Sequence, residues 1–163
     1  MARILVVDDD PSIRTLVAAV LESEDTEYEV ETAEDGTAAV ARLSDEDRPA
    51  PDAVVLDVMM PGLDGFEVLA WIRATTWLYD LPVVMLTART AHEDEVDGFH
   101  RGCDAYVRKP FEPTDLTEVL AGVLQAGPEL RIARRRQRLV ELLQGDLPLP
   151  LVDVPDEDAE TLA

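Results

Sequence analysis

Three short segments of this chain are apolar at every position: ILVV at 4–7, AVVL at 53–56 and VVML at 83–86. A strand with one face in water alternates apolar and polar residues, whereas a strand covered by helices on both faces is apolar throughout. All three segments are rich in β-branched residues, which favour strands. They therefore predict the central strands of a parallel sheet that lies between two layers of helices.

Helix-like stretches alternate with these and two weaker strand segments, a pattern typical of parallel strands joined by crossover helices. The predicted strands are Ile4 to Val7, Tyr28 to Thr32, Ala53 to Leu56, Val83 to Thr87 and Ala105 to Val107. The predicted helices are at roughly 11–23, 35–43, 65–74, 91–101 and 113–126. The first helix has Asp10 as its N-cap and Pro11 at its first position, and both favour helix initiation.

Composition limits the classes of function. The 163 residues, 47% of them hydrophobic, suffice for one domain with a buried core plus a tail. No apolar run approaches the roughly 18 residues that would cross a membrane. The chain has 14 Lys and Arg against 35 Asp and Glu, a net charge of -21, which repels nucleic acid and anionic lipid. We therefore expect no direct binding to nucleic acid or to a membrane.

The N-terminal sequence and the cysteine content bear on the compartment. MARILVVDDD reaches acidic residues after only four apolar ones, so it lacks the hydrophobic segment and cleavage site of a secretory signal. The single cysteine, Cys103, cannot form an internal disulfide, which agrees with a reducing compartment. We expect a cytoplasmic protein.

The composition changes after Pro128, and we expect three parts in the chain. Residues 1–126 would form the main domain. Residues 127–144 would form a basic amphipathic helix, because 129–144 carry five arginines and two acids, with Ile132, Leu139 and Leu143 near heptad spacing. This helix would pack on the main domain or on a twin chain. Residues 145–163, with six acids, no basic residue and three prolines, would form a disordered acidic tail.

Charged and hydroxyl side chains follow the predicted strands at their carboxyl ends: Asp8, Asp9, Asp57, Thr87 and Lys109. In an open parallel sheet, ligands bind outside these ends, where the strand order reverses. Three close carboxylates repel one another unless a cation neutralises them, and hard oxygen ligands suit Mg²⁺. A carboxylate beside such an ion, an ammonium and a hydroxyl can attack phosphorus. The residues predict a site that forms an aspartyl phosphate.

From Ala2 to about Ala126, the chain resembles the receiver domain of two-component response regulators. The matching motifs are the acidic pair Asp8-Asp9, D-x-x-M-P-x-x-D-G from Asp57 to Gly65, Thr87-Ala88 and Lys109-Pro110-Phe111. The resemblance implies a flavodoxin-like, doubly wound α/β fold. Its five-stranded parallel sheet would have the strand order 2-1-3-4-5.

The resemblance also implies a role for each site residue. Asp57 would accept a phosphoryl group from a histidine kinase or a phosphotransfer protein. Asp8, Asp9, Asp57 and the backbone carbonyl of Met59 would bind Mg²⁺. Lys109 would pair with the phosphoryl oxygens, and its bond to the following proline would be cis.

A switch is implied as well. Thr87 would move toward the phosphoryl group and draw Tyr106 inward, which would repack the face formed by the fourth helix, fifth strand and fifth helix. This face, or the C-terminal helix, could form a homodimer. The protein would bind a downstream protein partner or relay the phosphoryl group. Its only catalysis would be its own phosphorylation and dephosphorylation.

The size of the chain suggests a stand-alone receiver, because the 37 residues after Ala126 are too few for a DNA-binding domain. Three alternatives remain open. The chain could be a receiver-like scaffold that acts without phosphorylation, or a fragment of a longer regulator. It could also be a Mg²⁺-dependent phosphatase, although haloacid-dehalogenase-like phosphatases have an acidic residue where this chain has Met59.

Overall fold

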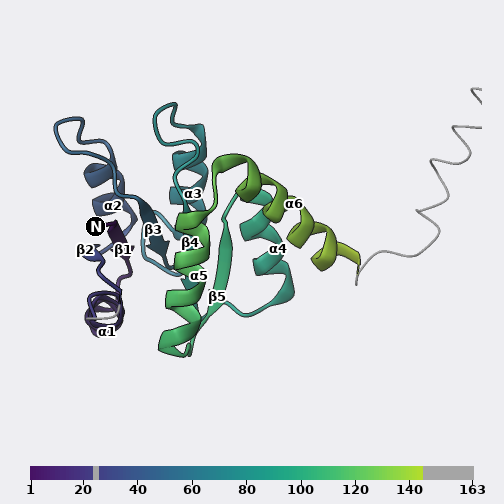
Figure 1. Ribbon diagram of the computed structural model, residues 1–163, viewed down its shortest axis with the longest axis horizontal. Coiled ribbons are helices and arrows are strands. Elements are labelled where there is room, and N and C mark those ends of the chain that lie inside the picture. Colours follow the sequence, from purple (N-terminus) through teal and green to yellow (C-terminus); the bar gives the residue numbers. More distant parts are fainter. Residues whose placement is uncertain (24–25, 145–163) are drawn as a thin grey trace, which may run out of the picture.

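The computed structural model describes residues 1–23 and 26–144, in which five strands alternate with six helices (Figure 1). The strands are β1 Arg3–Val7, β2 Glu29–Ala33, β3 Ala53–Leu56, β4 Val83–Thr87 and β5 Ala105–Arg108. The helices are α1 Pro11–Leu21, α2 Gly36–Leu43, α3 Gly65–Ala74, α4 His92–Arg101, α5 Pro113–Gln125 and α6 Pro128–Gln144. The acidic tail expected at 145–163 lies outside the described residues.

The strands form one parallel sheet in the order β2-β1-β3-β4-β5, which confirms the predicted doubly wound topology. In the sheet, β1 has β2 on one side and β3 on the other. The chain adds β2 in one direction and then adds β3, β4 and β5 in the opposite direction, so the strand order reverses between β1 and β3. Val7 at the end of β1 lies opposite Leu56 at the end of β3. The residues that follow these two strands, Asp8 and Asp57, are therefore neighbours across the sheet.

Each face of the sheet has its own hydrophobic core, because successive side chains of a strand point to opposite faces. Leu5 and Val7 join the cluster under α2, α3 and α4. Ile4 and Val6 join the cluster under α1 and α5. This arrangement explains why the central strand segments have no polar position.

The predicted strand and helix ends agree with the structure to within two residues. The larger differences are at α1, which ends at Leu21 rather than 23, and at β2, which runs one residue later than predicted. Asp10 caps α1 as predicted, since its side chain accepts a hydrogen bond from the backbone N–H of Ser12. In the part of the chain that the structure describes, no helix is long and apolar enough to cross a bilayer.

The C-terminal helix α6 lies along α4 (Figure 1). Its inward face follows the apolar series that the sequence suggested only in part, because Leu139 packs inward but Ile132 is 40% exposed. The residues that turn inward are Arg131, Arg135, Leu139 and Leu142. Two of these four are arginines, so α6 contacts the rest of the fold through ion pairs as well as through apolar packing.

Candidate functional site

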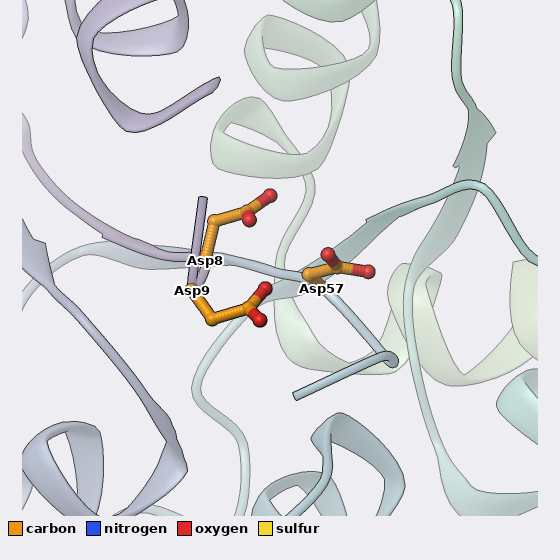
Figure 2. A group of neighbouring side chains, drawn as sticks. All are labelled: Asp8, Asp9 and Asp57. Carbon is orange, nitrogen blue, oxygen red and sulfur yellow. The ribbon is translucent and has the colours of Figure 1, made fainter. Parts of the chain in front are cut away.

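Three carboxylates meet at the carboxyl ends of β1 and β3 (Figure 2). Asp8 and Asp9 follow β1, and Asp57 follows β3. One carboxylate oxygen from each lies within 4.8 Å of those from the other two. Asp8 and Asp57 are only 3% and 5% exposed, whereas Asp9 is exposed to solvent. The fold thus holds two buried carboxylates beside a third that faces water.

Lys109 supplies the positive charge nearest to these carboxylates. Its Nζ donates hydrogen bonds to Asp8 Oδ2 at 2.6 Å and to Asp57 Oδ2 at 3.1 Å. Lys109 directly follows β5, and the Lys109–Pro110 peptide bond is cis, as the resemblance to receiver domains implied. The expected ammonium therefore reaches the pair of buried aspartates.

Burial and neighbouring charges in this pocket shift the pKa values of two groups, Asp8 and Lys109. Burial raises the pKa of Asp8, and the nearby charge of Asp57 adds to this shift, while the hydrogen bond from Lys109 opposes it. Burial alone would lower the pKa of Lys109, but its hydrogen bonds and the charges of Asp8 and Asp57 outweigh burial and raise it. Lys109 therefore stays an ammonium at neutral pH, and the aspartates retain an excess of negative charge.

The turn after β3 bends the chain sharply beside Asp57. The backbone N–H of Met59 donates to Asp57 Oδ1 at 3.2 Å, so the chain bends around the carboxylate. Gly65 then begins α3 so close to β3 that an added Cβ would lie 2.1 Å from the backbone oxygen of Asp57. Only glycine fits at this position, which is the structural reason for the last residue of the MPGLDG segment.

Thr87 ends β4, the neighbour of β3, and its side chain is fully buried. Its hydroxyl accepts a hydrogen bond from the backbone N–H of Arg89 at 3.1 Å. Its carbonyl accepts one from the backbone N–H of Lys109 at 2.9 Å. Thr87 is therefore tied both to the ammonium-bearing residue and to the loop that leads to α4.

Tyr106 lies on β5, half-buried, with its ring against α4: an added Cβ at Gly98 would be 3.1 Å from that ring. Its hydroxyl donates to the backbone oxygen of Arg89 at 2.7 Å. Burial raises the pKa of this phenol, so it remains a donor at neutral pH. Tyr106 and Thr87 thus contact the same residue, Arg89, from two strands.

Two buried acids outside this site were missed from the sequence. Asp104 accepts hydrogen bonds from Arg73 at 3.1 Å and from Arg135 at 2.9 Å, and Arg131 donates to it at 3.3 Å. Glu95 on α4 is the other. It accepts from Arg108 at 3.0 Å and from Arg138 at 2.8 Å. The signal for both was the spacing of 131, 135 and 138, which places three arginines on one side of a helix.

Comparisons with known proteins agree with this architecture. A family model, the response regulator receiver domain, matches residues 4–121. The chain is 45% identical over 127 residues to the transcriptional regulatory protein TcrA of Mycobacterium tuberculosis, covering 77% of this chain and 47% of TcrA. It is 40% identical over 123 residues to the phosphate regulon transcriptional regulatory protein PhoB of Escherichia coli, covering 76% of this chain and 52% of PhoB. The chain spans about half the length of these curated relatives.

Solved structures give the same result. The chemotaxis protein CheY4 of Vibrio cholerae superimposes with a TM-score of 0.68 at 37% identity, covering 76% of this chain and 98% of CheY4. A putative response regulator from Chloroflexus aurantiacus gives 0.70 at 32% identity, with 77% and 98% covered. The fold, the acidic pocket and these matches define a signalling module of two-component systems. The chain belongs to the response regulator receiver domain family.

Proposed function

We propose that this receiver accepts a phosphoryl group on Asp57 from a histidine kinase or a phosphotransfer protein, and that the modified form binds a different protein partner. The observation that carries the proposal is the position of Asp57. Its carboxylate lies beside two further aspartates and accepts a hydrogen bond from Lys109 Nζ at 3.1 Å. A buried carboxylate between a cation-attracting pair and an ammonium is suited to attack phosphorus.

The donor set fits Mg²⁺. Asp8, Asp9 and Asp57 offer hard oxygen ligands close together, as this ion prefers, and the exposure of Asp9 leaves room for water ligands. We assign the backbone carbonyl of Met59 as a fourth protein ligand. When bound, Mg²⁺ would neutralise the carboxylates and withdraw negative charge from the phosphoryl oxygens.

The transfer step follows from the positions of this chain's own groups. A carboxylate oxygen of Asp57 forms a bond to phosphorus while the bond from phosphorus to the donor's imidazole nitrogen breaks, and the electron pair of that bond stays on the imidazole. The ammonium of Lys109 would hold charge that develops on the phosphoryl oxygens, and the hydroxyl of Thr87 would move toward the phosphoryl group and donate to one of them. A surface pocket of about 390 Å³, lined in part by Asp9, Met59 and Arg89, provides access for the donor.

The consequence of phosphorylation would be mainly geometric. The carboxylate loses its own charge in the acyl linkage, so the change in net charge is smaller than on serine phosphorylation. We propose that Thr87 and Tyr106 convert the new bond into a repacking of the surface formed by α4, β5 and α5, which would bind the downstream partner or a second copy of the chain. Residues 1–126 would be the receiver module and 127–144 its helical extension. The protein would be cytoplasmic and would not bind nucleic acid directly.

Intact-mass spectrometry tests this proposal. The protein and its Asp57→Asn variant would be incubated with Mg²⁺ and a small acyl-phosphate donor, with and without EDTA. We expect one added phosphoryl group that requires both Mg²⁺ and Asp57. An unmodified protein after treatment with both the small donor and a phosphorylated histidine kinase would instead favour a scaffold that acts without phosphorylation.

A further inference from the structure

The surface of α4 and β5 already has an occupant, α6. The contact is apolar toward the end of α6, where Leu142 is buried and Leu139 packs into the same cluster as Phe99 of α4. Beside it lies Glu95 of α4, whose carboxylate is only 5% exposed. We define the α4–β5 surface by Glu95, Phe99 and Arg108, the residue of β5 that pairs with Glu95.

Two sets of ion pairs hold α6, one near its start and one just past its middle. Near its start, Arg131 and Arg135 bond to Asp104, in the turn between α4 and β5. Just past its middle, Arg138 donates to Glu95 at 2.8 Å. The first contact is with a turn at the amino end of β5, far along the strand from Lys109. The second is with the first turns of α4, the part of this helix that follows the Thr87 to Arg89 loop.

A continuous set of contacts joins the site to this second anchor. The backbone of Arg89 donates to the Thr87 hydroxyl and accepts from the Tyr106 hydroxyl. The side chain of Arg89 donates to Asp94 at 3.2 Å, and Asp94 is the residue before Glu95 on α4. A displacement of this loop therefore moves the segment of α4 that holds Arg138.

We propose that α6 is a built-in occupant of the α4–β5 surface, and that phosphorylation of Asp57 releases the second half of α6 so that a partner protein can bind there. This inference rests on the proposed function of Asp57. The first half of α6 stays attached through Asp104, so only the second half of the helix leaves the surface. The α4–β5 surface thus binds α6 in the unphosphorylated protein and a partner protein in the phosphorylated one.

The short connection between α5 and α6 lets α6 compete effectively with a partner protein. Only Ala126 and Gly127 separate α5 from α6. A segment on so short a connection has an effective concentration of about millimolar or higher, so even weak docking keeps the surface covered. A partner's apparent affinity then equals its intrinsic affinity multiplied by the fraction of molecules in which α6 is displaced. Phosphorylation that weakens the Arg138–Glu95 contact would raise this fraction.

Hydrogen exchange of the full chain, followed by mass spectrometry, tests the release. In the unmodified protein, Arg138→Ala should speed exchange of the peptide covering 138–144 by about fivefold or more, the low end of typical couplings between sites. Arg136→Ala is the matched control, because Arg136 is an exposed arginine of the same helix. Treatment with Mg²⁺ and an acyl-phosphate donor should speed hydrogen exchange of the same peptide in the wild type. It should leave the exchange rate unchanged in Asp57→Asn.

The intact mass of each exchanged sample separates the two ways this can fail. A sample that carries one phosphoryl group on Asp57, yet exchanges residues 138–144 at the unmodified rate or more slowly, would overturn the release of α6 and leave the proposed function standing. The absence of any adduct would overturn the proposed function, and this inference with it.

Coupling between two binding events is reciprocal, which provides a second test. Beryllium trifluoride with Mg²⁺ is a stable mimic of the acyl phosphate, and its equilibrium affinity can be measured by fluorine NMR. If α6 docking opposes the phosphorylated state, Arg138→Ala should bind this probe more tightly, by about fivefold or more, than wild type or Arg136→Ala. Equal affinity in all three proteins would overturn the inference.

Discussion

Two groups of charged side chains in this protein have opposite charge balances. At the carboxyl ends of β1 and β3, three aspartates have one lysine in contact, and that lysine bonds to two of them. At the turn between α4 and β5, a single aspartate accepts hydrogen bonds from three arginines. The first group, which we call the site aspartates (Asp8, Asp9 and Asp57), has excess negative charge, and the second, around Asp104, has excess positive charge.

The difference explains why one group can bind a ligand and the other cannot. Asp104 has its oxygens occupied by arginines from α3 and α6, and its side chain is 2% exposed. Burial, helped by the charges of Arg135 and Arg131, lowers the pKa of Arg73 to about 10 even though Asp104 opposes the shift. No negative charge is left there to attract a cation. The site aspartates are three carboxylates with one lysine in contact, and solvent reaches the site through the exposed Asp9, as suits a metal site that keeps water ligands.

The largest effect on stability is expected from Asp104→Ala. The substitution leaves three arginines, of which Arg131 is only 5% exposed, without their common acceptor. Removing one partner from a buried ionic group typically costs about 3–5 kcal/mol. Urea unfolding at pH 7 would measure this loss. A change below about 1 kcal/mol would show that water replaces Asp104 and that the arginines are not held by its charge.

A smaller loss is expected from Lys109→Met, which removes the ammonium from the site aspartates. Two buried carboxylates then lose a hydrogen bond each, at 2.6 and 3.1 Å. The expected cost is about 1–3 kcal/mol without metal, because solvent beside the exposed Asp9 screens part of the remaining negative charge. Added Mg²⁺ should recover part of this stability, which thermal unfolding would detect. If Lys109→Met were as costly as Asp104→Ala and insensitive to Mg²⁺, the two groups would not differ as described.

Much of this contrast could be predicted from the sequence, and part of it could not. The site aspartates were found because each follows a predicted strand, and parallel strands bring their carboxyl ends together. Asp104 and Glu95 were missed because the arginines that bind them are up to 43 residues away, and the arginine spacing alone does not say which acids it will meet. The inward face of α6 was misjudged for the same reason. Apolar periodicity favoured Ile132, but buried acids on the opposing surface select Arg131 and Arg135.

Neutralising Asp8 should have an effect that depends on pH. Its pKa is raised in the folded protein from 3.8, chiefly by burial, so the ionised form is less stable in the folded state than in the unfolded chain. In EDTA, the wild type should therefore lose stability relative to Asp8→Asn as the pH rises above 3.8 toward the folded-state pKa. Thermal unfolding across pH 3 to 7 would measure the difference. A wild type that instead gained stability over this range would indicate that Lys109 outweighs burial.

The smallest effect is expected from Asp97→Ala, on the outer side of α4. Asp97 pairs with Arg101 one helical turn away at 2.8 Å, but both side chains are about 40% exposed. Exposed pairs of this kind contribute about 0.3–0.5 kcal/mol. Urea unfolding should place this variant within that margin of the wild type. A loss approaching that of Asp104→Ala would mean that burial does not set the strength of these ion pairs.

The central claim is that the uncompensated charge of the site aspartates makes this edge of the sheet a Mg²⁺ site, which phosphorylation of Asp57 requires. The most direct test is calorimetric titration of Mg²⁺ into the wild type, Asp9→Asn and Asp10→Asn. Asp10 is the matched control, because it is an exposed neighbour whose role as the N-cap of α1 asparagine can fulfil. We predict one site that is lost in Asp9→Asn and retained in Asp10→Asn, and equal binding by all three proteins would contradict the account.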